Sequence, residues 1–162
     1  MHAQILLFGG NQGNVILAIK SAIEMLRSRL GNVVKQSFYY ESEPWGFEAS
    51  QNFINQVVEF HSPLSPKELL DLTQHVEQEL GRKEKTGTHY ESRPIDIDIL
   101  FIDEVEINTP RLVIPHPRLH ERRFTLLPLN DKWPNKIHPK LNKSMNELLL
   151  ICPDGGEVKR ID

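Results

Sequence analysis

The sequence predicts an α+β protein in which helices pack on a mainly antiparallel sheet. Two observations support this class. Four strand-like segments and two amphipathic helical segments follow one another in the order β-α-β-β-α-β. The 162 residues, of which 39 % are hydrophobic, suit one domain, residues 1–162, with a real core. This order of elements is that of a ferredoxin-like sandwich, whose sheet leaves one side for loops and a site.

The first strand is predicted from Ile5 to Phe8 and the first helix from about Asn14 to Leu30. The strand is a short apolar run that stops at two glycines, and the helix carries an apolar stripe at helical spacing. The stretch between them, FGGNQGN, matches neither a phosphate-binding P-loop nor a dinucleotide motif. A tight turn with a helix cap, or a nucleotide site of another architecture, both remain open for it.

Two more strands are predicted at Val33–Tyr40 and Phe53–Phe60, separated by the loop SEPWGFEASQ. The second of these alternates, so that Phe53 and Asn55 share the face opposite the core. An aromatic ring beside an amide suits a flat heterocycle, because the ring stacks and the amide hydrogen-bonds to the heterocycle's edge. The alternative is a half-buried phenylalanine with a packing role only.

The second helix has a clear start, with Ser65 as N-cap, Pro66 in the first turn and Glu68 completing a capping box. It is predicted to end near Leu80. A polar loop follows, GRKEKTGTHYES, and we expect this loop to close over bound substrates.

The stretch RPIDIDIL predicts a strand whose isoleucines line one face while Asp96 and Asp98 share the other. Two carboxylates about 6.5–7 Å apart repel by roughly 2.5 kcal/mol at an effective dielectric near 20. One interpretation is therefore an ordinary strand whose aspartate face is exposed to solvent. The alternative is that a cation lies between the two carboxylates.

The remainder of the chain is predicted to be less regular. Glu104–Ile107 is expected to be a short hairpin partner of the aspartate strand. IPHPRLHERRF is a proline-broken loop with one helical turn, and a last helix spans Ser144–Leu150.

Charge and composition exclude several classes. The net charge of −3 gives no basic field for nucleic acid, and the start of the chain contains neither a basic leader nor a membrane span. The solitary Cys152 excludes an internal disulfide and suits a reducing compartment. We therefore expect a cytoplasmic monomer.

The arginines gather around the aspartate pair. Six of the nine lie between residues 82 and 123, together with His89, His116 and His120. Such a cluster indicates a phosphate-rich ligand, although a salt-bridged surface would share the pattern. Carboxylates beside phosphate oxygens, with no cysteine nearby, favour magnesium over zinc or copper.

Five motifs together resemble the 6-hydroxymethyl-7,8-dihydropterin pyrophosphokinase family of folate biosynthesis. They are GGNQGN, SFYYESEPWG, FINQVV, SRPIDIDIL and IPHPRLHERRFTLLPL, within residues 4–139. The resemblance implies a ferredoxin-like fold, and transfer of pyrophosphate from ATP to the hydroxymethyl group of a reduced pterin with release of AMP.

The resemblance also implies residue roles. Asp96 and Asp98 would hold two magnesium ions, with Arg82 and Arg93 on the phosphates as further catalytic residues. The residues that would bind ATP are Gln74, Glu77, Arg111, His116 and Arg122. Those that would bind the pterin are Ser42, Glu43, Trp45, Phe53, Asn55 and Phe124.

The chain departs from the family pattern in several places. Gly10 stands where serine is usual, Ser42 where threonine is common, and Tyr90–Arg93 replaces a common Trp-Gly-Pro-Arg. Lys83, Lys85 and His89 stand where the family often has arginines. The alternative from another class is a non-catalytic ferredoxin-like module that binds a nucleotide or metal for regulation.

Overall fold

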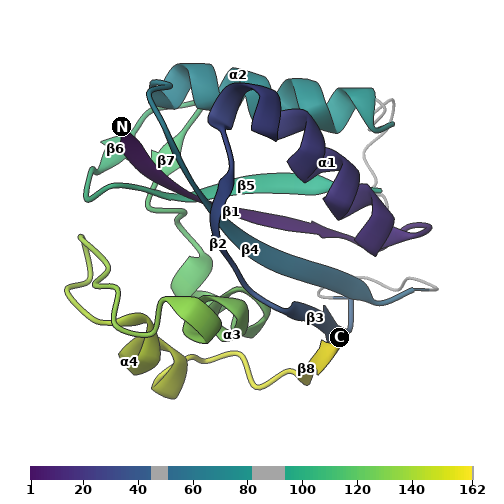
Figure 1. Cartoon of the computed structure of the whole chain (residues 1–162). Coiled ribbons are helices and arrows are strands. Elements are labelled where there is room, and N and C mark those ends of the chain that lie inside the picture. Colours follow the sequence, from purple (N-terminus) through teal and green to yellow (C-terminus); the bar gives the residue numbers. More distant parts are fainter. Residues whose placement is uncertain (45–50, 82–93, 162) are drawn as a thin grey trace.

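A computed structural model describes residues 1–44, 51–81 and 94–161. Its main sheet has the strand order β5-β1-β4-β3-β8, and β2 also pairs with β4 (Figure 1). These strands span His2–Gly10 (β1), Val33–Gln36 (β2), Tyr39–Ser42 (β3), Phe53–Ser62 (β4), Asp96–Ile102 (β5) and Val158–Ile161 (β8). Every pairing in the main sheet is antiparallel, which confirms the predicted fold class.

Helices α1 (Val15–Leu30) and α2 (Pro66–Glu79) lie together on one face of this sheet (Figure 1). Both begin as the sequence predicts. Asn14 accepts a hydrogen bond from the Leu17 amide, and Ser65 forms a complete capping box with Glu68. Their apolar stripes pack on the inward residues of the central strands, among them Leu6, Val58 and Ile97. This first core fixes which residues point to the opposite face.

The opposite face is covered in part by two shorter helices. They are α3 (Arg123–Lys132), which follows the 3-10 turn Leu119–Glu121, and α4 (Met145–Leu150) (Figure 1). A second core lies beneath them, made of residues such as Leu7, Val57 and Leu129. Helix α4 confirms the last predicted helix, with Ser144 as its N-cap. Helix α3 was not predicted, and it contains Pro128, a residue that local propensity disfavours inside a helix.

Three other elements differ from the predictions. The strand expected at Val33–Tyr40 is broken at Ser37, whose hydroxyl accepts the Val57 amide in place of a backbone carbonyl. The predicted hairpin partner of the aspartate strand is wrong. Instead, Ile107–Asn108 (β6) pairs with Val113–Ile114 (β7) in a separate small sheet. The terminal strand β8 was not predicted.

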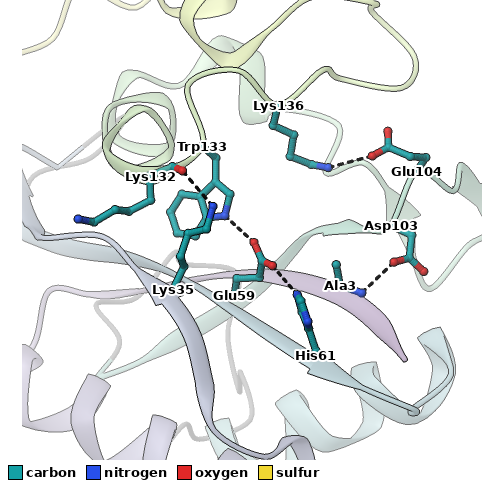
Figure 2. A network of polar contacts seen from close by, with 9 residues as sticks. All are labelled: Ala3, Lys35, Glu59, His61, Asp103, Glu104, Lys132, Trp133 and Lys136. Carbon is teal, nitrogen blue, oxygen red and sulfur yellow. Dashed lines mark hydrogen bonds and ion pairs between the residues drawn. The ribbon is translucent and has the colours of Figure 1, made fainter.

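The C-terminal end of α3 is fixed to the sheet through a buried carboxylate. The indole Nε1 of Trp133 donates to Glu59 Oε1 at 2.6 Å, and Glu59 Oε2 contacts His61 at 2.6 Å (Figure 2). Two residues before Trp133, the Asp131 carboxylate accepts hydrogen bonds from the Phe38 amide and the Tyr40 hydroxyl. Hydrogen bonds to a charged, poorly solvated carboxylate are stronger than neutral ones, so α3 has a defined position on the sheet.

The buried side chain of His138 makes the stability of the fold sensitive to acid. It is 4 % exposed, and its Nδ1 accepts the amides of Lys140 and Leu141. Burial first, then His120, Lys140 and Lys136, lowers the pKa of His138 from 6.5 to about 4. Between about pH 6.5 and pH 4, His138 is protonated in the unfolded chain but not in the folded chain. The free energy of unfolding therefore decreases as pH falls through this interval.

We expect the free energy of unfolding, measured with urea, to decrease over this pH interval. His138→Asn keeps an acceptor for the two amides but cannot titrate, so its stability should decrease less steeply. His116 contributes to the remaining slope, as do Asp103, Glu68 and Glu147, because the pKa of each of these groups is lowered in the folded protein. An identical pH slope in the wild type and in His138→Asn would contradict this assignment.

Candidate active site

A concave pocket opens on the sheet face that α3 covers in part, and we call it the sheet pocket. Its volume is about 630 Å³, including its open mouth. Strands β1, β3, β4 and β5 supply its floor and the N-terminal end of α3 supplies one wall. The lining residues are Leu7, Gly9, Ser42, Glu43, Phe53, Asn55, Asp96, Asp98, Arg122 and Phe124. The structure thus brings together most of the residues predicted to bind pterin and metal.

Gly9 lies at the centre of this floor, between Asn55 on β4 and Asp96 on β5. A Cβ atom at residue 9 would lie 2.0 Å from Asn55 Oδ1. Glycine is therefore required so that the Asn55 amide can lie over the strand. Asn55 is 4 % exposed, and its Nδ2 has no hydrogen-bond partner among the described residues. A buried amide donor of this kind is costly unless a ligand accepts from it.

Asp96 and Asp98 lie on the pocket face of β5, with Ile97 between them facing the first core. The position of this edge strand is fixed by α2. Glu77, which is 5 % exposed, accepts the Ile97 amide at 2.8 Å. Glu77 was predicted to line the nucleotide cleft. In the structure its carboxylate holds the strand segment that carries the two aspartates.

A second cavity adjoins the first at Asp98, and we call it the edge pocket. It measures about 600 Å³ with its mouth and lies between β5, α2 and the small sheet. Its lining is mostly apolar: Leu70, Ile97, Asp98, Ile99, Pro110, Arg111, Leu112, Val113, His116 and Pro117. Asp98 lines both cavities, so ligands in the two pockets would meet at this carboxylate.

Three of the five predicted ATP-binding residues line one of the two pockets, whereas Gln74 and Glu77 line neither. Arg111 and His116 line the edge pocket, and Arg111 donates to Asp71 at 2.9 Å and to Gln74 at 3.2 Å on α2. Arg122, in contrast, lines the sheet pocket, where its guanidinium lies 5.5 Å from the Phe124 ring. Sequence reasoning did not identify Asp71, nor the apolar residues of the edge pocket.

His116 is neutral at neutral pH in this structure. Burial first, then Arg122 and Arg118, lowers the pKa of His116 to about 4. Its Nδ1 accepts the Arg118 amide at 3.2 Å. The ring proton therefore resides on Nε2, where it can be donated to a ligand oxygen.

Three predicted residues cannot be placed. Trp45, Arg82 and Arg93 lie outside the described residues, as does the loop that was expected to close over substrates. Their assignments stay predictions.

The donors at Asp98 and Asp96 fit magnesium but do not enclose it. The described residues contain no group of three or more His, Cys, Asp or Glu side chains placed to hold a metal ion. Magnesium is commonly held by one or two carboxylates together with substrate phosphates, and two adjacent carboxylates match that pattern. A metal here would depend on the phosphates for the rest of its ligands.

Comparison with known proteins identifies the family. The sequence pattern of 7,8-dihydro-6-hydroxymethylpterin-pyrophosphokinase (HPPK) matches residues 5–134. The chain belongs to the HPPK family. It is 42 % identical over 137 residues to a 2-amino-4-hydroxy-6-hydroxymethyldihydropteridine pyrophosphokinase of Porphyromonas gingivalis, covering 83 % of this chain and 92 % of the relative. A protein of the same name from Aquifex aeolicus is 43 % identical over 139 residues, covering 86 % and 85 %.

A solved structure supports the fold. The crystal structure of Plasmodium falciparum HPPK-DHPS with pteroate superposes with a TM-score of 0.76 at 17 % identity, covering 92 % of this chain. This chain spans 44 % of that one.

Membership of the HPPK family makes the chain an ATP-dependent pyrophosphokinase of folate biosynthesis. It confirms the predicted family and activity, and the regulatory-module alternative is not favoured. No described helix is long and apolar enough to cross a membrane.

Gly9→Ala should damage the sheet pocket while leaving the protein folded. The added methyl displaces the Asn55 amide, because the two would be 2.0 Å apart. We expect binding of hydroxymethyl-dihydropterin to weaken about tenfold or more, the loss that follows from misplacing one buried hydrogen bond. Isothermal titration of the pterin measures this loss.

A double-mutant cycle provides the control. In an Asn55→Ala background the clash is absent, so adding Gly9→Ala should cost little further affinity. Fully additive losses would show that Gly9 matters for another reason.

Proposed function

We propose that the sheet pocket binds 6-hydroxymethyl-7,8-dihydropterin and the edge pocket binds ATP, with transfer at the junction beside Asp98. The observation that carries this proposal is the buried Asn55 amide, whose Nδ2 lacks a partner among the described residues. It lies in a pocket that also contains two phenylalanine rings, Phe53 from the sheet and Phe124 from α3. Aromatic faces with an amide at the edge fit a planar heterocycle that carries acceptors.

Asp96 and Asp98 would hold two magnesium ions together with the ATP phosphates. Bound magnesium would neutralise charge on the phosphates and orient the group that transfers. The two carboxylates lie two residues apart on the pocket face of β5. The backbone amide of Ile97, between them, is fixed by a hydrogen bond to Glu77. Their separation is therefore set by the backbone rather than by flexible side chains.

The cationic and neutral donors of this chain would complete the phosphate site. Arg122 reaches the sheet pocket and His116 the edge pocket, so they approach the junction from opposite sides. An uncharged His116 can donate Nε2–H without a proton change, because its pKa is about 4. Ser42 and Glu43 line the sheet pocket beside Phe53 and would contact the pterin edge.

The transfer would depend mainly on positioning. The substrate hydroxyl attacks the β-phosphorus of ATP, the bond from that phosphorus to the AMP oxygen breaks, and the hydroxyl proton leaves to solvent or phosphate. Such displacements need in-line alignment and charge stabilisation more than covalent help from the protein. Two pockets that share Asp98 supply that alignment.

We also propose that the protein acts as a cytoplasmic monomer. The lone Cys152, half-buried and unpaired, suits a reducing compartment. Analytical ultracentrifugation at micromolar concentration tests the oligomeric part of this proposal, and a single species near 18.7 kDa is expected.

The aspartates provide the first test. Asp96→Asn and Asp98→Asn should each lower kcat by about 10²–10³-fold or more, because the negative charge that holds metal at the phosphates is lost. The fold should survive, since both side chains face the pocket. The exposed Glu24→Gln on α1 removes one charge far from the site and should leave kcat unchanged. Turnover near the wild-type value in both aspartate variants would reject the metal assignment.

The rings provide the second test. Phe53→Ala and Phe124→Ala should weaken pterin binding several-fold while changing ATP binding less, because each stacked ring contributes on the order of 1 kcal/mol. Phe38→Ala, at an aromatic residue outside the pocket and 40 % exposed, serves as the matched control. Equal losses for both ligands in titrations would instead indicate a general packing role.

A further inference from the structure

The C-terminal segment, residues 152–161, contacts the sheet pocket's α3 wall and β3, one strand of its floor. At one end, Asp154 Oδ2 accepts the backbone amide of Arg123 at 3.1 Å. At the other, β8 pairs with β3 so that Val158 lies opposite Ser42, which in turn lies opposite Phe53. Figure 1 shows β8 beside β3 at the edge of the sheet. The family match ends at residue 134, so it assigns nothing to this segment.

Helix α3 begins without a cap of its own. Its N-cap residue is Arg122, whose guanidinium contains donors only and cannot accept the first amides of the helix. The first turn, RFTL, contains no acidic residue to interact with the positive end of the helix dipole. Asp154, 31 positions after Arg123, therefore provides the hydrogen-bond acceptor and the negative charge that an N-cap residue normally provides.

Asp154 is itself held in place. Its second oxygen, Oδ1, accepts the Gly156 amide at 2.9 Å, which closes a turn within the C-terminal segment. The chain then enters β8 two residues later. The carboxylate is thus oriented by a turn that is anchored in the sheet.

The hydrogen bond from Arg123 to Asp154 fixes the backbone between two pocket residues. Arg122 and Phe124 flank the capped amide and both line the sheet pocket. The other end of α3 is fixed to the sheet by Asp131 and Trp133, about a helix length away. Fraying of an uncapped first turn would move Arg122 and Phe124 first.

We propose that Asp154 is a positioning residue for pterin binding, acting through the first turn of α3 on Phe124 and Arg122. This inference rests on the proposed role of Phe124 as a wall of the pterin site. It makes the C-terminal segment part of the binding machinery, although none of its residues lines the pocket.

The test compares Asp154→Ala, Asp154→Asn and Glu157→Ala in the full chain with magnesium, ATP and hydroxymethyl-dihydropterin. Glu157 is the matched control, because it lies in the same segment, has the same charge and forms an exposed ion pair with Lys159 at 3.3 Å. Asp154→Ala should raise the KM for the pterin about three- to tenfold and the KM for ATP less than about twofold. Asp154→Asn keeps an acceptor and should fall between Asp154→Ala and the wild type. Glu157→Ala should match the wild type.

A second measurement is independent of substrate. Amide exchange at Arg123, followed by NMR in the free protein, should accelerate in Asp154→Ala and less in Asp154→Asn. Unchanged exchange, an unchanged KM for the pterin, or equal increases in both KM values would overturn the proposal. If exchange accelerates while Phe124→Ala leaves pterin binding intact, the failure lies in the proposed role of Phe124, and the positioning inference fails with it.

Discussion

The structure depends on how side chains alternate along three neighbouring strands, β5, β1 and β4, at the end of the sheet that carries the site. A register shift between Ile5 and Leu6 interrupts the pattern further along. Each strand carries two sets of residues: an apolar set under α1 and α2, and a second set on the opposite face that forms the second core and the floor of the sheet pocket. Register then aligns the second set, since Gly9 lies between Asn55 and Asp96, and Leu7 lies between Val57 and Asp98. A shift by one residue in β5 would turn Asp96 and Asp98 towards the first core, so the packing that stabilises the fold also specifies the site.

The second layer of helices gives this face its function. The core formed by Leu7, Val57 and α3 ends where the sheet pocket begins, so the site borders a packed region rather than a loose surface. Helix α3 is held at its C-terminal end by Asp131 and Trp133 and at its N-terminal end by Asp154. A binding wall held at both ends needs little ordering when a ligand arrives, which favours affinity.

Sequence reasoning predicted the parts of the site that depend on local patterns. The aspartates, Phe53 and Asn55 could be assigned to faces because a strand has a period of two, and the helix starts at Asn14 and Ser65 because capping chemistry is local. It could not predict what depends on tertiary contacts. Helix α3 tolerates Pro128 because packing outweighs propensity, and its cap comes from residue 154.

Other features of the site also depend on contacts between residues far apart in the sequence. The need for glycine at residue 9 arises from Asn55, 46 positions later, and no local turn reveals it. The predicted role of Glu77 in nucleotide binding stays a prediction, and the structure adds that its carboxylate accepts a hydrogen bond from the Ile97 amide. Arg122 was predicted to bind ATP, which stays a prediction, and the structure adds that its guanidinium lies beside Phe124.

The central claim is that two adjoining pockets align a pterin hydroxyl with the β-phosphate of ATP. Phosphorus NMR of the complete reaction tests it most directly. The account predicts that ATP is converted to AMP only when hydroxymethyl-dihydropterin is present, and that both the β and γ phosphorus atoms appear in one diphosphate ester of the pterin. Formation of ADP with a pterin monophosphate, or AMP release at the same rate without the pterin, would contradict it.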